Sequence, residues 1–188
     1  MGYWTALLGV MKATIERVPG KFPEPEFSTL QRTVFADIQQ ESMALAEVIA
    51  LERGDSVVSN EVTQPPMVRF GAYIDGQLVG WSAGHLERGN SFYMASSGVS
   101  PTHQRQGIYS ALLAAVLVHA REHGAQVVRS QHSVLNNRVI VCKLRRGFHI
   151  SGLSSTAQMG TLVELVHHLS QPRFELFRAR VIPHVAPR

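Results

Sequence analysis

A tight turn in the middle of the chain constrains the fold more than any other feature of the sequence. Asp75-Gly76 separates two segments rich in apolar residues, Val68–Ile74 and Leu78–His85. Asp-Gly is favoured in two-residue hairpin turns because both central positions of such a turn need a positive φ angle. A third segment of this kind, Ser91–Val99, follows a second turn at Gly89-Asn90. The sequence therefore predicts three antiparallel strands in a row.

Helices and further strands surround these three strands. Apolar residues at helical spacing predict four helices, and apolar-rich runs bounded by turn residues predict four more strands. We expect the helices over 28–53 (as a pair), 110–123 and 137–146, and the strands over 14–18, 148–154, 161–167 and from 125 to 128. This order is typical of an α/β (α+β) domain with one mixed, mostly antiparallel sheet flanked by helices.

The chain of 188 residues has the length of one ordinary domain. Since 45% of its residues are apolar, it can form a substantial core. We expect residues 13–170 to form this domain, with 1–12 as an N-terminal extension and 171–188 as a C-terminal tail. The mixture of apolar and arginine residues in the tail indicates no particular structure.

The sequence also predicts a soluble protein of the cytoplasm. Its single cysteine, Cys142, excludes a disulfide within the chain and fits a reducing compartment. No apolar run approaches the ~20 residues of a membrane-spanning helix, and residues 3–11 lack the basic flank of a secretory signal. We therefore expect a cytoplasmic location and no membrane partner.

The two halves of the chain differ in charge. Residues 1–100 contain 7 Lys/Arg and 11 Asp/Glu, whereas residues 101–188 contain 11 Lys/Arg and 3 Asp/Glu. A basic half indicates an anionic partner, such as a phosphorylated cofactor or a nucleic acid, or only a solvated basic face. Nucleic acid is the weaker choice, because no stacking aromatic residues are interleaved with Arg145 and Arg146. The nine histidines show no metal-binding spacing, so no metal is predicted.

The segment Ser100–Tyr109 connects the third strand to the next helix and carries the most chemical information. At such a junction, unpaired backbone N–H groups and the positive end of the helix dipole point at one spot, which suits a pyrophosphate. Gly107 would let the backbone approach the ligand closely, and Arg105 would add a positive charge at the rim. An ordinary strand-to-helix connection with a basic loop explains the spacing equally well.

This segment resembles the acetyl-CoA loop of the GNAT acetyltransferase superfamily, in which Gln/Arg-x-x-Gly-x-Gly/Ala follows a strand. Gln104 and Gly107 match that pattern, while Tyr109 stands where the family usually has Gly or Ala. A second match lies downstream, where Asn136, a short helix and Gly147-Phe148 are similar to the family's later motif. The two motifs occur in the order that the family has.

The resemblance, which covers roughly Val68–His168, implies a GNAT-like sheet whose central strands splay apart, with acetyl-CoA (coenzyme A) as cosubstrate. The strand 91–99 would part from the strand that begins at Ala125, so that backbone groups of Gly98 and Val99 could pair with pantetheine amides. The residues expected to bind the rest of coenzyme A are Gln104 at the start of the loop, Arg105, Gln106, Gly107, Ile108 and Tyr109 through their N–H groups, Asn136 at the pantetheine arm and Lys143 at a phosphate.

The resemblance further implies direct transfer of the acetyl group from the thioester to a primary amine of a small molecule or peptide. The Val99 N–H would stabilise the oxyanion, because strand pairing is interrupted there. The family often has a tyrosine as the acid on the late helix, and Lys143 stands at that position. It would either protonate the thiolate or contact a phosphate of coenzyme A. His132 and Glu87 are the candidate bases, unless the amine arrives uncharged.

Two other functions stay open. Because the tyrosine of the late helix and a carboxylate on the strand 91–99 are both missing, the chain could be a non-catalytic acyl-CoA-binding module of the same fold. A basic nucleic-acid-binding domain is the second alternative and rests on the charge of residues 101–188 alone. The sequence does not indicate the acceptor amine, and the last strand and the tail could form a homodimer.

Overall fold

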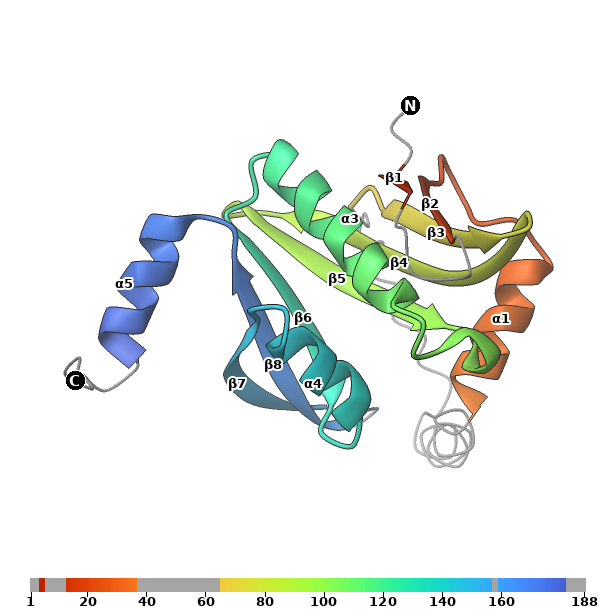
Figure 1. Cartoon of the computed structure of the whole chain (residues 1–188). Coiled ribbons are helices and arrows are strands. Elements are labelled where there is room, and N and C mark those ends of the chain that lie inside the picture. Colours follow the sequence, from red (N-terminus) through yellow and green to blue (C-terminus); the bar gives the residue numbers. More distant parts are fainter. Residues whose placement is uncertain (1–3, 6–12, 37–64, 157–158, 182–188) are drawn as a thin grey trace, which may run out of the picture.

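The computed structural model describes residues 4–5, 13–36, 65–156 and 159–181. This part of the chain forms an eight-stranded sheet with helices on both faces (Figure 1). In space the strands follow the order β1-β2-β3-β4-β5-β6-β8-β7. The strands are β1 (Trp4–Thr5), β2 (Thr14–Arg17), β3 (Val68–Ile74), β4 (Gln77–Glu87), β5 (Ser91–Val99), β6 (Val127–Ser133), β7 (His149–Thr156) and β8 (Gly160–His168). The helices are α1 (Glu26–Val34), α3 (Ile108–Glu122), α4 (Asn137–Leu144) and α5 (Gln171–Val181), and a 3₁₀ turn covers Pro101–His103.

The three antiparallel strands predicted around Asp75-Gly76 are β3, β4 and β5. Pairing of Tyr73 with Leu78 and of Ile74 with Gln77 closes the hairpin, with φ angles of 49° at Asp75 and 79° at Gly76. The bounds of β3 and β5 are those predicted. The predicted fold class is confirmed, because the sheet is mixed and mostly antiparallel, with β5 and β6 as the parallel pair in the described residues.

The N-terminal half of the chain has one strand more than expected. Trp4–Thr5 pairs with β2 as an added edge strand, so the segment from Thr14 is the second strand and not the first. Of the helical pair predicted over 28–53, the structure shows α1, and the remainder of that pair lies outside the described residues. The start of the sheet therefore includes residues that were expected to be only an extension.

The C-terminal half differs as well. β6 begins at Val127 rather than Ala125. It runs to Ser133 because each of its residues, the polar ones included, pairs with a residue of β8. The tail contains α5, in which the Phe177 ring stacks on His149 of β7 with 3.7 Å between ring centroids. A polar strand and a helix of low hydrophobicity are both held by tertiary contacts that a local pattern does not contain.

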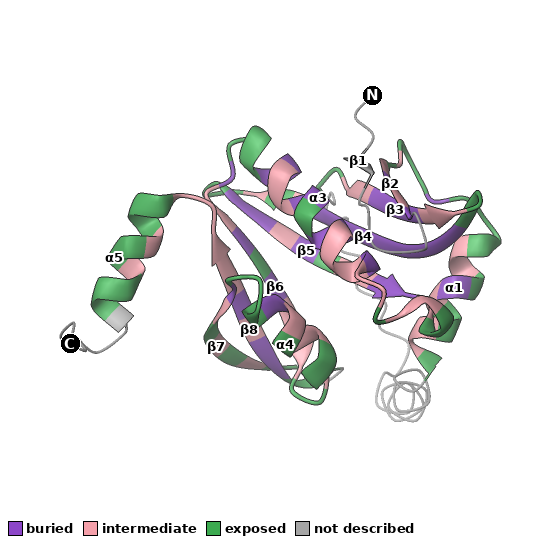
Figure 2. Ribbon diagram, in the orientation of Figure 1, coloured by how far each residue is buried: buried purple, intermediate pink, exposed green. Residues whose placement is uncertain are grey.

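Each face of the sheet has its own hydrophobic core. On one face, Leu112 and Val116 of α3 are buried in a cluster with Phe92 of β5. On the other face, Leu30 of α1 is buried in a cluster with Trp81 of β4. Figure 2 shows the buried residues following the central strands and the inner side of α3. Burial of such side chains contributes about 1.5–3 kcal/mol each, so these clusters fix β4 and β5 and everything that projects from β5.

Candidate active site

β5 and β6 pair over only part of their length and then diverge. They are parallel partners from Ser91 with Val127 to Tyr93 with Arg129, and the pairing ends there. Figure 1 shows the two strands separating beyond this point. The edge of β5 that faces β6 is therefore unpaired from Met94 onward, over about 20 Å at ~3.3 Å per residue. Such an edge leaves backbone N–H and C=O groups for a ligand.

The register of β5 on β4 decides which backbone groups point into this gap. The Ser100 N–H donates to the Val79 carbonyl at 2.8 Å. Because hydrogen-bonded and non-hydrogen-bonded pairs alternate along an antiparallel ladder, the backbone groups of Gly98 point at β4, and those of Ser97 and Val99 point toward β6. The Val99 N–H thus faces the gap. In this register the backbone groups of Gly98, which were predicted to pair with pantetheine, point toward β4, and the gap is lined by those of Ser97 and Val99.

Gly98 is needed for packing instead. A Cβ atom at this position would lie 2.6 Å from the Trp81 ring and 2.7 Å from Val34 of α1. Gly98→Ala is therefore expected to lower the free energy of unfolding by about 1–3 kcal/mol, the cost of overpacking a close-packed core. Urea denaturation measures this change, and a midpoint equal to that of the wild type would show that the core has room for a methyl group.

The connection from β5 to α3 contains two residues in the left-handed conformation. The φ angle is 63° at Arg105 and 81° at Gly107, and Gly107 is the N-cap of α3. No side chain caps this helix, so the N–H groups of its first turn, from Ile108 onward, have no partner within the helix. The Gln106 side chain turns back to the Thr102 carbonyl at 3.4 Å. The start of α3 thus leaves backbone N–H groups without partners in the helix, and such groups at a helix N-terminus favour an anion.

Gln104 lies at the open end of the gap, where its side chain links the end of β5 to α4. Its Nε2 donates to the Val99 carbonyl at 3.3 Å, and its Oε1 accepts a hydrogen bond from Arg138 of α4 at 3.2 Å. Arg138 of α4 is exposed, as is Arg105 in the loop before α3, so two positive charges flank the opening. Arg138 was not predicted, because its contact with Gln104 joins positions that are 34 residues apart.

Two residues that were predicted to bind the cofactor, Tyr109 and Asn136, also have structural roles within the protein. The Tyr109 ring packs against the α3 core, and its buried hydroxyl has no hydrogen-bond partner among the described residues. Burial raises the pKa of this phenol above its usual value, so it stays protonated. Asn136 caps α4 by accepting from the Val139 N–H at 3.4 Å. The Tyr109 backbone N–H and the Asn136 amide N–H₂ group are what remain for a ligand.

Lys143 is fully buried, with 0% of its surface exposed. Its Nζ donates to the Ser130 hydroxyl at 2.6 Å, lies 3.5 Å from Met94 Sδ and 5.0 Å from the centre of the Phe148 ring. Burial lowers the pKa of this ammonium group from 10.5 to about 7. A buried position facing β6 does not fit the predicted phosphate contact, and it favours the proton-donor alternative.

His132 shares Ser130 with Lys143. The Ser130 hydroxyl lies 3.2 Å from His132 Nε2 and can donate to it, since Lys143 already donates to the hydroxyl oxygen. Burial, and to a lesser extent the charge of Lys143, lowers the pKa of His132 from 6.5 to about 3. An imidazole with so low a pKa is a poor base for an ammonium substrate. Of His132, Ser130 and Lys143, Lys143 is therefore the residue that can release a proton near neutral pH.

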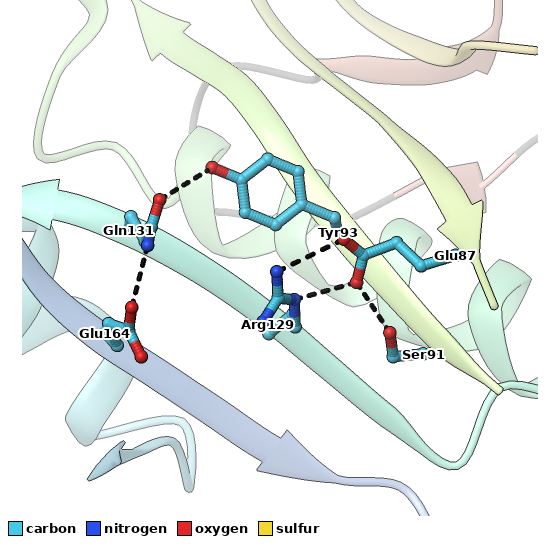
Figure 3. A network of polar contacts seen from close by, with 6 residues as sticks. All are labelled: Glu87, Ser91, Tyr93, Arg129, Gln131 and Glu164. Atoms are coloured by element: carbon cyan, nitrogen blue, oxygen red, sulfur yellow. Dashed lines mark hydrogen bonds and ion pairs between the residues drawn. The ribbon is translucent and has the colours of Figure 1, made fainter. Parts of the chain in front are cut away.

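Glu87 is held in an ion pair at the closed end of the gap. Its Oε2 lies 2.7 Å from Arg129 Nε and accepts from the Ser91 hydroxyl at 2.6 Å, while its Oε1 accepts from the Arg129 Nη2 at 3.2 Å (Figure 3). Both oxygens are therefore occupied by groups of the protein. This arrangement does not fit the predicted role of Glu87 as a base.

Comparison with family models gives one match, to the acetyltransferase (GNAT) family over residues 30–148. The chain belongs to the GNAT acetyltransferase family. A search of curated proteins finds no match for this GNAT protein. The matched region includes the unpaired edge of β5, the loop before α3 and Lys143 of α4.

Solved structures share the fold of this GNAT protein at low sequence identity. The ribosomal-protein-S18-alanine N-acetyltransferase from Escherichia coli is 14% identical, with a TM-score of 0.62 over 85% of this chain and 95% of that one. Nourseothricin acetyltransferase is 24% identical, with a TM-score of 0.53 over 56% of this chain and 67% of that one. A GNAT acetyltransferase from Elizabethkingia anophelis, solved with acetyl-CoA bound, is 12% identical with a TM-score of 0.59, covering 83% of this chain and 97% of that one.

The described part of this GNAT protein has neither a cluster of metal-binding side chains nor a membrane-spanning helix. Among these residues, no three His, Cys, Asp or Glu side chains come together to hold a metal ion. No helix in the same part of the chain has the length and hydrophobicity to cross a membrane.

Proposed function

We propose that this GNAT protein transfers an acetyl group from acetyl-CoA to a primary amine of a small molecule or peptide, by direct attack of the amine on the thioester. The observation that carries the proposal is the unpaired edge of β5, which ends in the Val99 N–H and is followed at once by the N–H groups of the loop before α3. Family membership supports acyl transfer in general. The acceptor and the roles of single residues are inferred from the site.

Binding of acetyl-CoA is assigned to backbone groups and to the two arginines at the opening. The N–H groups of Arg105, Gln106, Gly107, Ile108 and Tyr109 would hold the diphosphate, because N–H groups at a helix N-terminus match an anion in charge and direction. Arg138 of α4 would add a positive charge from the opposite side of the gap. The backbone groups of Ser97 and Val99, together with the Asn136 amide, would pair with the pantetheine arm. Gln104 would have to give up its bond to the Val99 carbonyl or share that oxygen.

The chemical step needs a donor for the oxyanion and a proton for the departing thiolate. The Val99 N–H would stabilise the oxyanion that forms as the amine nitrogen bonds to the carbonyl carbon. When the carbon–sulfur bond then breaks, Lys143, whose Nζ lies beside Met94 rather than Val99, would supply a proton to the thiolate through water in the gap. The proton that the nitrogen loses on becoming an amide would restore Lys143 by the same route. A donor with a pKa of about 7 can release a proton near neutral pH, which an ordinary lysine does not.

Ser130 would position Lys143 for this transfer. It is 1% exposed, and its hydroxyl lies between Lys143 Nζ at 2.6 Å and His132 Nε2 at 3.2 Å. A hydroxyl that accepts from one side and donates on the other fixes the direction of the lysine side chain. His132 is then the neutral end of this chain of hydrogen bonds and not the base that was expected from its position in the sequence.

Acetyl-CoA binding tests the proposal first. Addition of acetyl-CoA at a hundredfold excess over its Kd is expected to stabilise the protein by about 2.7 kcal/mol, measured by thermal melting. Release of free thiol with a panel of amines then distinguishes an enzyme from an acyl-CoA-binding module, which would be stabilised but release none. Stabilisation by a nucleic acid and not by acetyl-CoA would instead support the basic nucleic-acid-binding alternative.

A further inference from the structure

β7 forms an open edge of the sheet. The last strand of the chain, β8, lies between β6 and β7, so it is an inner strand (Figure 1). One side of β7 pairs with β8, and the other side has no partner strand in the described part of the chain. The backbone N–H and C=O groups on that side are therefore available to another strand.

The usual protections of an edge strand are missing from β7. Natural edge strands are guarded by charged side chains, by proline or by a covering helix. Residues His149–Thr156 include no Asp, Glu, Lys, Arg or Pro. Burial lowers the pKa of His149 below its usual value, so this side chain is uncharged at neutral pH. α5 contacts His149 through Phe177, on the face of the sheet opposite to Ile150, and most of β7 stays exposed (Figure 2).

Two large apolar side chains of β7 lie on the same face of the sheet. Ile150 is paired with Leu165 of β8, which is buried in the core on the α3 face. Leu153 is paired with Val163 of the same core. A bulge at Ser151 brings Ile150 and Leu153, three positions apart, to one face. Since their exposed fractions are 53% and 68%, the apolar face continues uncovered from the core to the edge of the sheet.

We propose that a second copy of this chain pairs with β7, antiparallel to it and about a two-fold axis between Ser151 and Gly152. In this register Ile150 of each copy lies opposite Leu153 of the other, so both apolar side chains are covered by apolar partners. Because β7 carries no charge, no like charges oppose each other across the axis. A foreign peptide strand would gain the same backbone pairing without these reciprocal contacts.

The symmetry of this contact limits the assembly to a dimer. A two-fold axis uses the same surface on both chains, so pairing through β7 leaves no free copy of that surface. The strands β8 and β6 separate β7 from the gap beside β5. Dimer formation therefore leaves the proposed acetyl-CoA site open, and the inference does not depend on the proposed function.

The oligomeric state of the full chain tests the interface. At micromolar concentration the wild type is expected to sediment with twice the 20.8 kDa mass of one chain. Leu153→Lys places two positive charges in the interface and is expected to raise the dissociation constant of the dimer by about thirtyfold or more, as for the loss of an interface hot spot. Lysine is common on exposed edge strands, so circular dichroism is expected to show an unchanged fold. Leu86→Lys, at an exposed leucine of β4, is the matched control and is expected to remain dimeric.

Disulfide crosslinking tests the register of the two copies. In a Cys142→Ser background, the double variant Ile150→Cys/Leu153→Cys is expected to form a covalent dimer on oxidation, whereas each single variant is not. Within one chain the Cα atoms of these positions are roughly 8–10 Å apart, beyond the ~7 Å that a disulfide can span. The inference is overturned by a wild type that sediments as a monomer, by a Leu153→Lys variant that dimerises as tightly as the wild type, or by a double variant that does not crosslink. None of these measurements uses acetyl-CoA, so failure of the proposed acetyl transfer would leave them unaffected.

Discussion

Lys143→Met is expected to reduce turnover by about a hundredfold to a thousandfold, the range over which a general acid contributes to a reaction. Methionine keeps an unbranched side chain of similar reach but has no proton to give. The fully buried Lys143 has the Ser130 hydroxyl as its close polar contact, and neither of the other candidate acid–base residues can replace it. The rate of thiol release at saturating acetyl-CoA and amine measures this effect.

The same variant is expected to be at least as stable as the wild type. A charged group that is removed from water without a counterion destabilises the fold, and no carboxylate lies within ion-pair distance of Lys143 in the described residues. Loss of activity without loss of stability would therefore separate a catalytic role from a structural one. Thermal melting of both proteins gives this comparison, and Lys21→Met, at an exposed lysine of the β2–α1 connection, is the control.

The stability of the wild type is expected to rise as the pH increases from about 7 toward 10. The folded Lys143 loses its proton near pH 7, whereas a lysine in the unfolded chain keeps its proton up to about 10.5. In this window the unfolded state binds more protons, so the free energy of unfolding increases with pH. Lys143→Met is expected to lack this part of the increase, because it has no group that titrates there.

The turnover rate is expected to fall as the pH rises, whereas the stability rises. The proposed donor is the protonated form of Lys143, and its population falls as the pH rises through about 7. Two results would contradict the assignment. One is a Lys143→Met variant that keeps more than about a third of the wild-type rate, and the other is a wild type whose pH dependence of stability matches that of the variant.

The parts of the molecule that could be predicted from the sequence are those specified by short-range signals. The turn at Asp75-Gly76 sets the hairpin of β3 and β4, and the turn at Gly89-Asn90 sets the start of β5. Gly107 was placed correctly at the start of a helix, because a strand, a glycine-containing loop and a helical pattern follow one another directly in the chain. Each of these inferences needs about ten residues and no tertiary contact.

The rest of the site depends on which faces and edges meet. The direction of the Gly98 backbone groups could not be predicted, because it is set by the register of β5 on β4 and by a bulge in that pairing. The contact between Lys143 and Ser130 joins residues 13 positions apart and depends on how α4 lies on β6. Sequence order alone gives no distance between these side chains.

Gly107→Val is expected to weaken acetyl-CoA binding by about a hundredfold, the loss of one or two hydrogen bonds between backbone N–H groups and a charged phosphate. With a φ angle of 81°, Gly107 has a conformation that β-branched residues avoid, and a side chain there would stand where the diphosphate is expected.

Gly124→Val is the matched control at the other end of α3, since Gly124 has a φ angle of 80° and open space around its Cβ position. Both variants are expected to lose a similar stability of about 1–2 kcal/mol from backbone strain. At an acetyl-CoA concentration that stabilises the wild type and Gly124→Val by about 2.7 kcal/mol, Gly107→Val would be stabilised by only about 0.4 kcal/mol. Equal stabilisation of the two variants in thermal melting would show that the loop before α3 does not bind the diphosphate.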